Sequence, residues 1–538
     1  MINLEKTSFT EEPATTMNQS TKKHLRGSTL LLTGRVIAMV ANFIVQVLIV
    51  RYLSKSDYGA FAYVLSLVSL GSSLAVFGFE KTVTRYIPMY QERGEYHKVF
   101  GSLIMMVSAV FSLGFFLVLL VFGLRGWIAT SVVHDPLAVQ LLLLLIFLTP
   151  IQAMDSLLVG MLAIFSKPSS IFFRRYVLGP SLRLLVVILL IVFQKDVYFL
   201  STGFIAAGTL GILIYYGILI HDLRKEESWK HFSLQKIKIP VKEIFGFSIP
   251  LFTSSFVFMV RTHLVIILLE YFRGTLDVAA YRAVQPVSDL NTTVVQSFAL
   301  LFMPTMARLY ARKDHEGIDN LYWQSAVWIA VISFPIFLLT FSLAQPLTVL
   351  LFGERYAQSG WIMAVLAFGY YFNAALGFNA DTLRTYGRFR YTVVVDFVVT
   401  FICLGLSMII IPRYGAMGAA IVTCATLVLY NILNHIGLSF ATKINLFEGR
   451  YLKVYLSIIL GTLGLVLLQS WLNLPIYVGV LLAGIISLVV LVLNRAVLNI
   501  EHLFPELLRF RLIQVLFAVR PIKNGSVMNT VPTTFTEK

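Results

Sequence analysis

Two arginines inside long apolar stretches are the first residues of this sequence that could do chemistry. Arg35 lies in the apolar stretch 28–50, and Arg261 lies in the apolar stretch 244–269. An arginine at the centre of a membrane-spanning helix costs roughly 2.5–3.5 kcal/mol on insertion scales, so it usually faces a protein interior or water. We therefore predict that Arg35 lines a polar cavity, because no carboxylate shares its helix face.

Two amides extend this polar face of the first apolar stretch. Asn42 and Gln46 follow Arg35 at intervals of seven and four residues. At about 100° per residue, the three side chains fall within about 40° of arc on one helix. The spacing predicts a single polar stripe, in which Asn42 and Gln46 either join helices by hydrogen bonds or line a cavity.

The stretch 278–303 is the most polar of the apolar stretches. Arg282, Gln285 and Asp289 share one face by helical spacing. Arg282 and Asp289 are two turns apart, roughly 10 Å along the axis, so a direct ion pair needs a kink. Pro286 lies between them and could supply that kink. The face either joins helices through a polar network or lines a water-filled cavity.

Four ionisable residues inside apolar stretches are candidates for binding or relaying an ion. They are Asp155, Asp289, Asp396 and His263. The carboxylates could relay protons, bind sodium or simply neutralise arginines, and a histidine titrates near neutral pH. The sequence leaves these alternatives open.

Motifs for enzymatic, metal or cofactor chemistry are absent from the sequence. There is no Gly-rich phosphate loop followed by Lys-Ser or Lys-Thr, no metal-spaced His or Cys cluster and no nucleophile elbow. Cys403 and Cys424 both fall in apolar stretches, which favours neither a disulfide framework nor a metal site. We predict a protein that is not an enzyme, with no catalytic residue, no metal and no cofactor.

The composition is that of an integral membrane protein. Hydrophobic residues make up 58% and charged residues 13% of the 538 positions, and the mean hydropathy is +0.81. The net charge of +16 does not indicate nucleic-acid binding, because the basic residues lie between apolar stretches rather than among aromatics in a soluble domain. We expect contact with membrane lipids and none with nucleic acid.

The sequence divides into about fourteen membrane-length apolar stretches, and we predict an all-α fold from them. A span of about 20 apolar residues crosses a bilayer as a helix. The predicted spans are 28–50, 58–79, 101–123, 137–163, 170–193, 199–220, 244–269, 278–303, 322–343, 357–382, 391–411, 415–440, 452–471 and 475–494.

The basic residues predict the orientation of these spans. With the N-terminus inside, the cytoplasmic segments hold about 32 of the 43 Lys and Arg, the outer loops about 7 and the spans about 4. Cytoplasmic loops of membrane proteins are enriched in these residues. We therefore predict a multi-pass protein of the cell (plasma or inner) membrane with both termini in the cytoplasm.

The chain also shows signs of an internal repeat. Asp277-Val278-Ala279-Ala280-Tyr281 echoes Asp57-Tyr58-Gly59-Ala60-Phe61 at an offset of about 220, although apolar helices also resemble one another by chance. Internal symmetry of this kind is typical of membrane transporters with two bundles around a central site. The predicted parts are a tail (1–27), a six-span lobe (28–220), a cytoplasmic loop (221–243), a second six-span lobe (244–440), two extra spans (441–495) and a tail (496–538).

Three motifs in this frame carry a resemblance to a known family. They are Arg51-Tyr52-Leu53-Ser54 running into Asp57-Tyr58-Gly59, then Gly78-Phe79 followed by Thr84-Arg85-Tyr86, and Pro412–Ala420. With these motifs the sequence resembles the polysaccharide-transporter branch of the multidrug/oligosaccharidyl-lipid/polysaccharide exporter superfamily, and within it the O-antigen-type oligosaccharide flippases. The likeness extends over about residues 28–495.

The resemblance implies two six-helix lobes around a cavity that opens alternately inward and outward. It implies that a polyprenyl-diphosphate-linked oligosaccharide moves from the cytoplasmic to the outer leaflet for polysaccharide assembly, with a polysaccharide polymerase or glycosyltransferases as partners. Cavity arginines of related lipid II flippases are thought to engage the diphosphate. The matching candidates are Arg35 and Arg261, with Arg51, Arg85 and Arg282 behind them, and a guanidinium suits a diphosphate by its fixed fork of donors.

One departure and two alternatives remain. Members of this family often carry an acidic residue near the position of Thr262-His263, and this chain has none there, which puts ion coupling through that span in doubt. A drug or small-molecule exporter of the same superfamily should favour acidic cavity residues over arginines. A membrane glycosyltransferase or polymerase should carry a long outer loop with clustered carboxylates, which this sequence lacks.

Overall fold

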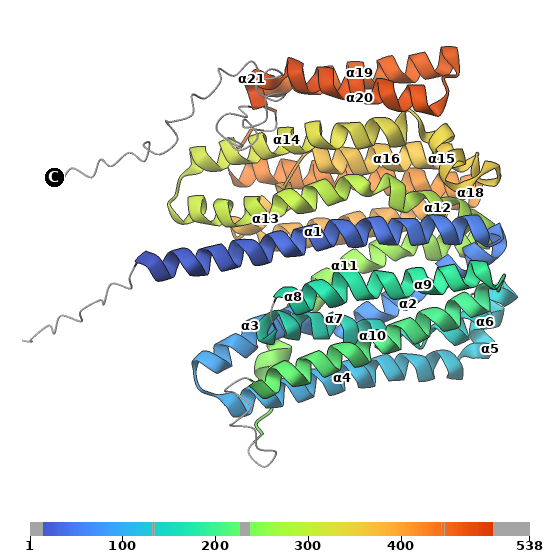
Figure 1. Ribbon diagram of the computed structural model, residues 1–538. Coiled ribbons are helices and arrows are strands. Elements are labelled where there is room, and N and C mark those ends of the chain that lie inside the picture. The colour runs from blue at the N-terminus through green and yellow to red at the C-terminus, as the bar shows by residue number, and fades with distance from the viewer. Residues whose placement is uncertain are drawn as a thin grey trace, which may run out of the picture. The chain divides into compact units, whose positions relative to one another are not determined.

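The computed structural model describes residues 14–131, 133, 135–166, 168–225, 237–442, 444–445 and 447–498, and all regular elements within these ranges are helices (Figure 1). Residues 1–13 of the predicted N-terminal tail, 226–236 of the predicted inter-lobe loop and 499–538 of the predicted C-terminal tail lie outside the described residues. The prediction of an all-α membrane protein is confirmed.

The first half of the chain forms α1 to α10. Their bounds are α1 (Ala14–Tyr52), α2 (Lys55–Val76), α3 (Phe79–Glu92), α4 (Tyr96–Gly123), α5 (Arg125–Ser131), α6 (Pro136–Leu145), α7 (Leu148–Phe165), α8 (Pro168–Ile171), the π-helical turn η1 (Phe172–Leu178), α9 (Gly179–Val192) and α10 (Val197–Lys225). The remaining elements are α11 (Val241–Arg273), α12 (Thr275–Ser288), α13 (Leu290–Ala311), α14 (His315–Phe341), α15 (Ala344–Phe352), η4 (Glu354–Tyr356), α16 (Ser359–Ala375), α17 (Asn379–Thr385), α18 (Phe389–Ala441), η5 (Gly449–Tyr451), α19 (Leu452–Leu472), α20 (Ile476–Leu493) and α21 (Arg495–Leu498).

The described helices account for the predicted membrane spans. Twelve of them are long and apolar enough to cross a membrane, and a thirteenth span results if the pair Thr275–Ala299 and Phe302–Ala311, bent by 44°, counts as one. The chain is therefore a multi-pass integral membrane protein. The prediction of about fourteen spans differs by one because 391–411 and 415–440 are joined in the single element α18.

A glycine explains how α18 can hold two predicted spans. The element is 53 residues long, far more than the roughly 20 that a bilayer requires. Gly415 interrupts it with φ 54° and ψ −132°, a conformation that glycine adopts without steric cost. Pro412, three residues earlier, cannot donate a backbone hydrogen bond. The two arms of α18 match the eleventh and twelfth predicted spans.

Local sequence signals fix where several helices begin. Ser54 caps α2, its hydroxyl accepting a hydrogen bond from the Asp57 amide at 3.0 Å. Asp57 also places a negative charge in the first turn of α2, where it interacts favourably with the positive end of the helix dipole. These two residues belong to the first motif of the family resemblance, so part of that motif encodes a turn between α1 and α2.

Contacts divide the chain into two compact units, and the first contains Met1–Pro286, Thr348–Leu366 and Val393–Thr426. Within it, α7 packs against α2, α3, α4 and α10 (Figure 1). The core between these helices is apolar and fully buried, with Phe79, Tyr90, Met106 and Leu157 among its members. This packing fixes the faces of α7 and α10 that carry the polar residues described below.

The second unit contains Val287–Leu347, Ala367–Thr392 and Leu427–Lys538. Its core is rich in aromatic side chains, including Phe334 and Phe337, and Phe337 stacks on Tyr371 with ring centroids 4.2 Å apart. α14 packs against α13, α19 and α20 in this unit. Each lobe predicted from the sequence is one continuous stretch of chain, whereas each of these units combines several separate stretches that contact one another. The boundaries of the two lobes therefore stay a prediction.

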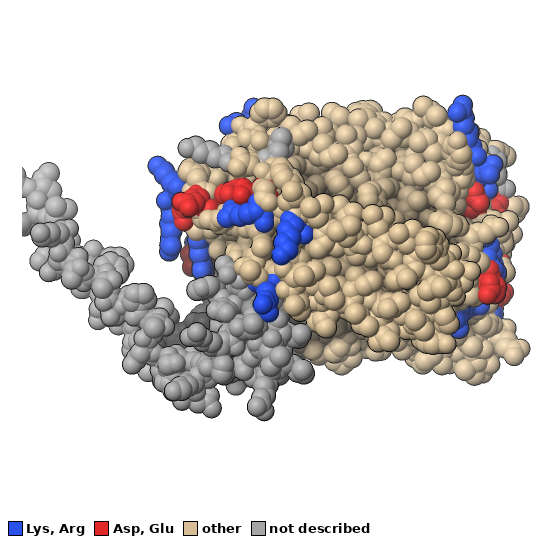
Figure 2. Space-filling view, turned by 90° about the horizontal axis from the view of Figure 1, so that it is seen from above, with Lys and Arg blue, Asp and Glu red and all other residues tan. Residues whose placement is uncertain are grey.

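The distribution of charge agrees with a membrane environment. On the face drawn in Figure 2, Lys, Arg, Asp and Glu gather towards the two ends, and the broad area between them is formed by other residues. Many large apolar side chains are exposed on the helices, for example Phe401, Leu460 and Leu481 at 69%, 67% and 64%. A soluble protein rarely exposes so much apolar surface, whereas lipid tails cover it in a bilayer.

Candidate functional site

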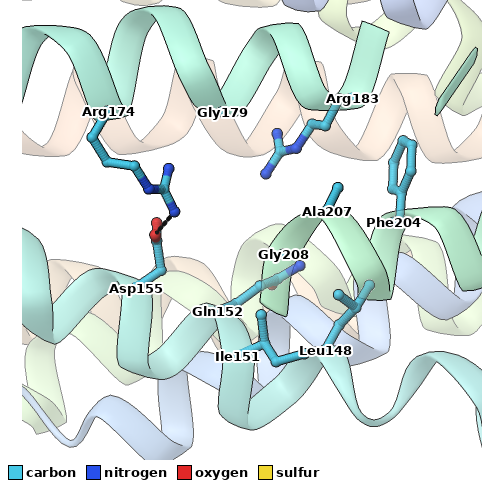
Figure 3. A pocket seen from close by; sticks show the side chains of 10 residues that line it. All are labelled: Leu148, Ile151, Gln152, Asp155, Arg174, Gly179, Arg183, Phe204, Ala207 and Gly208. Atoms are coloured by element: carbon cyan, nitrogen blue, oxygen red, sulfur yellow. Dashed lines mark hydrogen bonds and ion pairs between the residues drawn. The ribbon is translucent and has the colours of Figure 1, made fainter. Parts of the chain in front are cut away.

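A polar pocket lies inside the first unit, between helices that are otherwise apolar. It has a volume of about 80 Å³ and lies between α7, the η1–α9 segment and α10 (Figure 3). Its lining residues are Leu148, Ile151, Gln152, Asp155, Arg174, Gly179, Arg183, Phe204, Ala207 and Gly208. Two arginines, one aspartate and one amide thus line a cavity within membrane-spanning helices. We call it the arginine pocket.

A π-helical turn positions the first arginine. In η1 the Gly179 amide donates to the Arg174 carbonyl oxygen, five residues back, instead of the four of an α-helix. The wider turn changes the direction in which the following residues point. Turns of this kind are rare and frequently occur at functional sites.

Arg174 is held by contacts to two other helices. Its Nη2 lies 2.6 Å from Asp155 Oδ1 on α7 (Figure 3), and its Nε donates to the Gly211 carbonyl oxygen on α10 at 3.0 Å. The guanidinium also lies over the Tyr215 ring, 3.9 Å from the centroid. Its side chain is 8% exposed, so a buried, charge-assisted network holds this residue.

Arg183 lines the same pocket from α9 without such support, and unlike Arg174 it is exposed. Its guanidinium points between the helices towards the space beside Gln152 (Figure 3). Among the residues that the structure describes, Arg183 forms no ion pair. Asp155 is paired with Arg174, which leaves the arginine pocket with a net charge of plus one.

The sequence predicts a role for Asp155 but not for Arg174 or Arg183. Arg174 and Arg183 are nine positions apart. At about 100° per residue, a regular α-helix would place their side chains about 180° apart, on opposite faces. The π-helical turn changes that relation. The signal available in the sequence was the presence of three arginines, Arg174, Arg175 and Arg183, inside the predicted span 170–193.

The structure brings Arg261 and Asp396 together. Arg261 Nη1 on α11 lies 3.7 Å from Asp396 Oδ1 on α18, and the side chains are 11% and 6% exposed. The Arg261 guanidinium also lies 5.5 Å from the centroid of the Phe258 ring. From the sequence, Arg261 was proposed to bind an anion, and Asp396 to relay protons, bind sodium or neutralise an arginine. In the structure the two residues form an ion pair. Their roles in binding stay predictions.

The polar face of the eighth predicted span is divided between two local contacts. Arg282 Nη1 donates to Gln285 Oε1 at 2.8 Å, one turn along α12. Asp289 follows the end of α12 and accepts a hydrogen bond from the Thr292 hydroxyl. His263 on α11 is buried, at 9% exposure. The predicted roles of these residues in ion or substrate binding stay untested.

One residue of the polar stripe on α1, Gln46, forms a hydrogen bond to another helix. Arg35 is half-buried and Asn42 is exposed. Gln46 Nε2 donates to the Tyr58 hydroxyl at 2.5 Å, which joins α1 to α2. One of the two amides therefore joins helices, as one of the two alternatives for this stripe predicted. Arg85, on α3, is exposed and lies 4.3 Å from the centroid of the Phe247 ring.

Arg51 takes part in a reciprocal contact that the sequence did not reveal. Its Nε donates to the Leu351 carbonyl oxygen at 2.7 Å, and its Nη2 to that of Leu350, near the end of α15. In return, Arg355 Nη2 donates to the carbonyl oxygens of Val50 and, at 2.7 Å, Arg51 near the end of α1. Arg51 therefore binds carbonyl oxygens at the C-terminal end of α15, and Arg355 binds those at the C-terminal end of α1. The last carbonyls of a helix have no partner within that helix, and the helix dipole favours a positive charge beside them.

Within the described ranges, no group of three or more His, Cys, Asp or Glu side chains is arranged to hold a metal ion. The polar groups inside the spans are arginines, amides and single carboxylates. Their chemistry is the binding of anions and the formation of ion pairs.

Comparison with known families decides the classification. The family model described as "Polysaccharide biosynthesis protein" matches residues 24–310, which is more than half of the chain. The chain belongs to the polysaccharide biosynthesis protein family. A second model, MatE, matches residues 250–412. The resemblance inferred from the sequence motifs is confirmed.

Two curated relatives of this polysaccharide biosynthesis family protein are similar in sequence. The capsular polysaccharide biosynthesis protein CapF of Staphylococcus aureus is 28% identical over 182 residues, which are 34% of this chain and 46% of that protein. This match therefore spans less than half the length of the staphylococcal protein. An uncharacterised membrane protein of Methanocaldococcus jannaschii, MJ1068, is 22% identical over 425 residues, 75% of this chain and 81% of that protein.

Solved structures show the same fold at low sequence identity. A lipid II flippase, MurJ, in an inward closed conformation has a TM-score of 0.68 and 13% identity, covering 88% of this chain and 100% of that one. An inward-facing multidrug resistance MATE transporter of the MOP superfamily has a TM-score of 0.62 and 13% identity, covering 75% and 95%. A MOP-superfamily transporter of Pyrococcus furiosus has a TM-score of 0.54 and 14% identity, covering 77% and 94%. This family member therefore has the fold of MOP-superfamily transporters.

The family match covers the arginine pocket but not every residue discussed above. All ten lining residues of the pocket, and Arg35, Arg261 and Arg282, lie within the matched range 24–310. Asp396 and Arg355 lie beyond it. The polysaccharide biosynthesis family assignment thus rests on the part of the chain that carries most of the arginines inside spans.

Proposed function

We propose that this protein is a flippase that moves a polyprenyl-diphosphate-linked oligosaccharide from the cytoplasmic to the outer leaflet of the cell membrane. Family membership and the MOP-superfamily fold support a transporter of polysaccharide biosynthesis. Alternating access between two lobes would carry the headgroup across while the lipid tail stays in the bilayer. Both termini lie in the cytoplasm in this proposal, in accord with the distribution of Lys and Arg.

The observation that carries the proposal is an excess of arginine over acidic partners inside the spans. Among the described residues, Arg35, Arg183 and Arg282 form no ion pair with a carboxylate. A permanently charged guanidinium in a membrane-spanning helix is costly unless something neutralises it. A diphosphate supplies two neighbouring anionic groups that match the donor geometry of guanidinium.

Arg35 is the first candidate ligand for the diphosphate. It is half-buried on α1. The Gly34 position beside it lies close to the rings of Phe172 and Tyr176, so this part of α1 packs against η1. Arg261, the second predicted ligand, has Asp396 as a partner 3.7 Å away, and a bound diphosphate would compete with that carboxylate.

A binding measurement with matched variants tests this proposal. Purified protein in nanodiscs should bind a polyprenyl-diphosphate oligosaccharide, and Arg35→Gln and Arg261→Gln should each weaken binding by about tenfold or more, because each removes charge-assisted hydrogen bonds. Arg125→Gln removes an exposed arginine of α5 and should leave the affinity unchanged. Wild-type affinity in both Arg35→Gln and Arg261→Gln would refute these residues as ligands.

Export of small molecules is the second candidate function, favoured by the MatE match over residues 250–412. The same nanodiscs decide between the two. Binding of an organic cation, with no binding of any lipid-linked diphosphate, would support the exporter. Partner proteins for the flippase, such as a polysaccharide polymerase or glycosyltransferases, follow only if lipid-linked oligosaccharide is bound.

A further inference from the structure

The ion pair between Arg261 on α11 and Asp396 on α18 holds two charges within membrane-spanning helices of the first unit. The two side chains are 11% and 6% exposed, so water screens them poorly. Arg261 Nη1 and Asp396 Oδ1 are 3.7 Å apart, whereas a charge-assisted hydrogen bond joins the two atoms at about 2.7–2.9 Å. The contact of these two atoms is therefore long, and a better acceptor can replace it.

Arg261 also lies beside an exposed part of α11. Phe258, one turn before it, is 54% exposed, and the Arg261 guanidinium lies 5.5 Å from the centroid of its ring. Thr262, the next residue along the chain, is exposed as well. The guanidinium is thus within reach of a ligand on this side of α11, while Asp396 is held deeper.

A diphosphate and the Asp396 carboxylate compete for the same donors. The proposed function places a diphosphate on Arg261, and the present inference rests on that placement. A guanidinium offers a planar fork of N–H groups that two phosphate oxygens match in short, parallel hydrogen bonds. The diphosphate also carries more negative charge than one carboxylate. It therefore displaces Asp396 from Arg261.

The displaced carboxylate loses the charge that balances it. Hydrogen bonds from neutral groups do not cancel a charge, and burial together with a neighbouring anion favours the protonated form of a carboxyl group. The other titratable groups near the pair are the Cys403 thiol, two turns along α18 and in electrostatic contact with Arg261, and the buried His263 on α11, which interacts with Arg282. Neither the thiol nor a neutral imidazole supplies a positive charge to Asp396.

We propose that Asp396 takes up one proton from water when a diphosphate binds to Arg261. The free site holds one positive and one negative charge. The occupied site holds the guanidinium, the diphosphate and a neutral carboxyl group, and release of the ligand returns the proton to water. Because the occupied protein binds more protons than the free protein, lower pH strengthens diphosphate binding.

Calorimetric titration measures this proton directly. Purified full-length protein in nanodiscs is titrated with farnesyl diphosphate, a short and soluble polyprenyl diphosphate, in buffers of different ionisation enthalpy. We expect wild type to take up about one proton more per bound ligand than Asp396→Asn, and the difference cancels protons that the ligand itself binds. The affinity of wild type, relative to Asp396→Asn, should rise by up to about tenfold for each unit by which the pH falls.

The affinity of Asp396→Asn separates this role from a merely structural one. Removing the competing charge should strengthen farnesyl diphosphate binding at neutral pH by about tenfold or more, because the buried guanidinium is left without a counter-charge. A variant that only disturbed the structure would bind more weakly. Asp381→Asn is the matched control, since the Asp381–Arg384 pair is 37% and 39% exposed, and it should bind farnesyl diphosphate and protons as wild type does.

Infrared difference spectra keep the test decisive even if Asp396→Asn folds poorly. Farnesyl diphosphate has no carboxyl group, so a protonated carboxyl signal that appears when it binds comes from the protein. We expect that signal in wild type and in Asp381→Asn, and not in Asp396→Asn. Farnesol, which lacks the diphosphate, should produce none.

Two results would overturn the inference while leaving the flippase proposal in place. One is binding of farnesyl diphosphate to wild type without a new protonated carboxyl group. The other is equal proton uptake in wild type and Asp396→Asn, which would assign the proton to another group such as His263. No binding of farnesyl diphosphate to wild type would instead contradict the diphosphate site at Arg261, on which both proposals rest.

Discussion

The pair Arg261–Asp396 gives the sharpest test of how this protein keeps an arginine inside its membrane-spanning helices. The substitution Asp396→Asn keeps the shape of the side chain but removes its charge. The pair is buried, with side chains 11% and 6% exposed and 3.7 Å between Nη1 and Oδ1. Removing one partner of a buried pair leaves the other charge uncompensated, which costs more than the pair itself contributes.

The size of the effect follows from the environment of Arg261. Removing one partner of a buried ion pair costs roughly 3–5 kcal/mol. The contact with Phe258, with the guanidinium 5.5 Å from the ring centroid, offsets part of that. We therefore expect Asp396→Asn to lower the free energy of unfolding by about 2–3 kcal/mol. The double variant Arg261→Gln, Asp396→Asn removes both charges and should recover most of the loss.

A surface pair supplies the control for this measurement. Asp381 and Arg384 lie 3.2 Å apart, but their side chains are 37% and 39% exposed. Exposed pairs contribute about 0–1 kcal/mol, so Asp381→Asn should cost no more than that. Reversible unfolding in mixed detergent micelles measures both variants under the same conditions. An Asp396→Asn protein as stable as Asp381→Asn would refute the assignment of Asp396 as the counterion of Arg261.

Two further predictions follow from close contacts inside the first unit. Gly59→Ala should lower the free energy of unfolding by about 1–3 kcal/mol, because a Cβ at this position would collide with the Thr275 carbonyl. Gly123→Ala is the control, since a Cβ there meets no atom within 4 Å and should not lower it. A Gly59→Ala protein as stable as Gly123→Ala would contradict the packing of Gly59 against Thr275. Arg51→Ala and Arg355→Ala should each cost about 1 kcal/mol, since both arginines are exposed. A double-mutant cycle should show coupling between them, and strictly additive losses would contradict the reciprocal contact.

Hydropathy alone predicted most of the fold. Each predicted apolar stretch corresponds to described helix, because a membrane leaves the backbone no other way to satisfy its hydrogen bonds. Hydropathy could not predict the junction near Gly415. There the two predicted spans form one continuous element, α18, which is interrupted by the positive φ of Gly415. Hydropathy marks where a chain can cross a bilayer, but it does not tell a turn from a kink.

The candidate site was predicted only in part, for reasons that its residues show. Asp155 and Asp396 were singled out because carboxylates are rare inside spans. Their partners depend on tertiary packing, and the π-helical turn between Phe172 and Leu178 makes helical spacing a poor guide to Arg174 and Arg183. The contact of Arg51 with the end of α15 joins residues about 300 positions apart and has no local signal.

Translocation by the isolated protein is the most direct test of the proposed function. Proteoliposomes containing only this protein are loaded with a lipid-linked oligosaccharide, and the headgroups that become accessible in the opposite leaflet are measured over time. The flippase proposal predicts protein-dependent translocation that falls strongly in Arg35→Gln and Arg261→Gln but not in Arg125→Gln. No translocation of any lipid-linked glycan, together with transport of soluble organic cations, would contradict it.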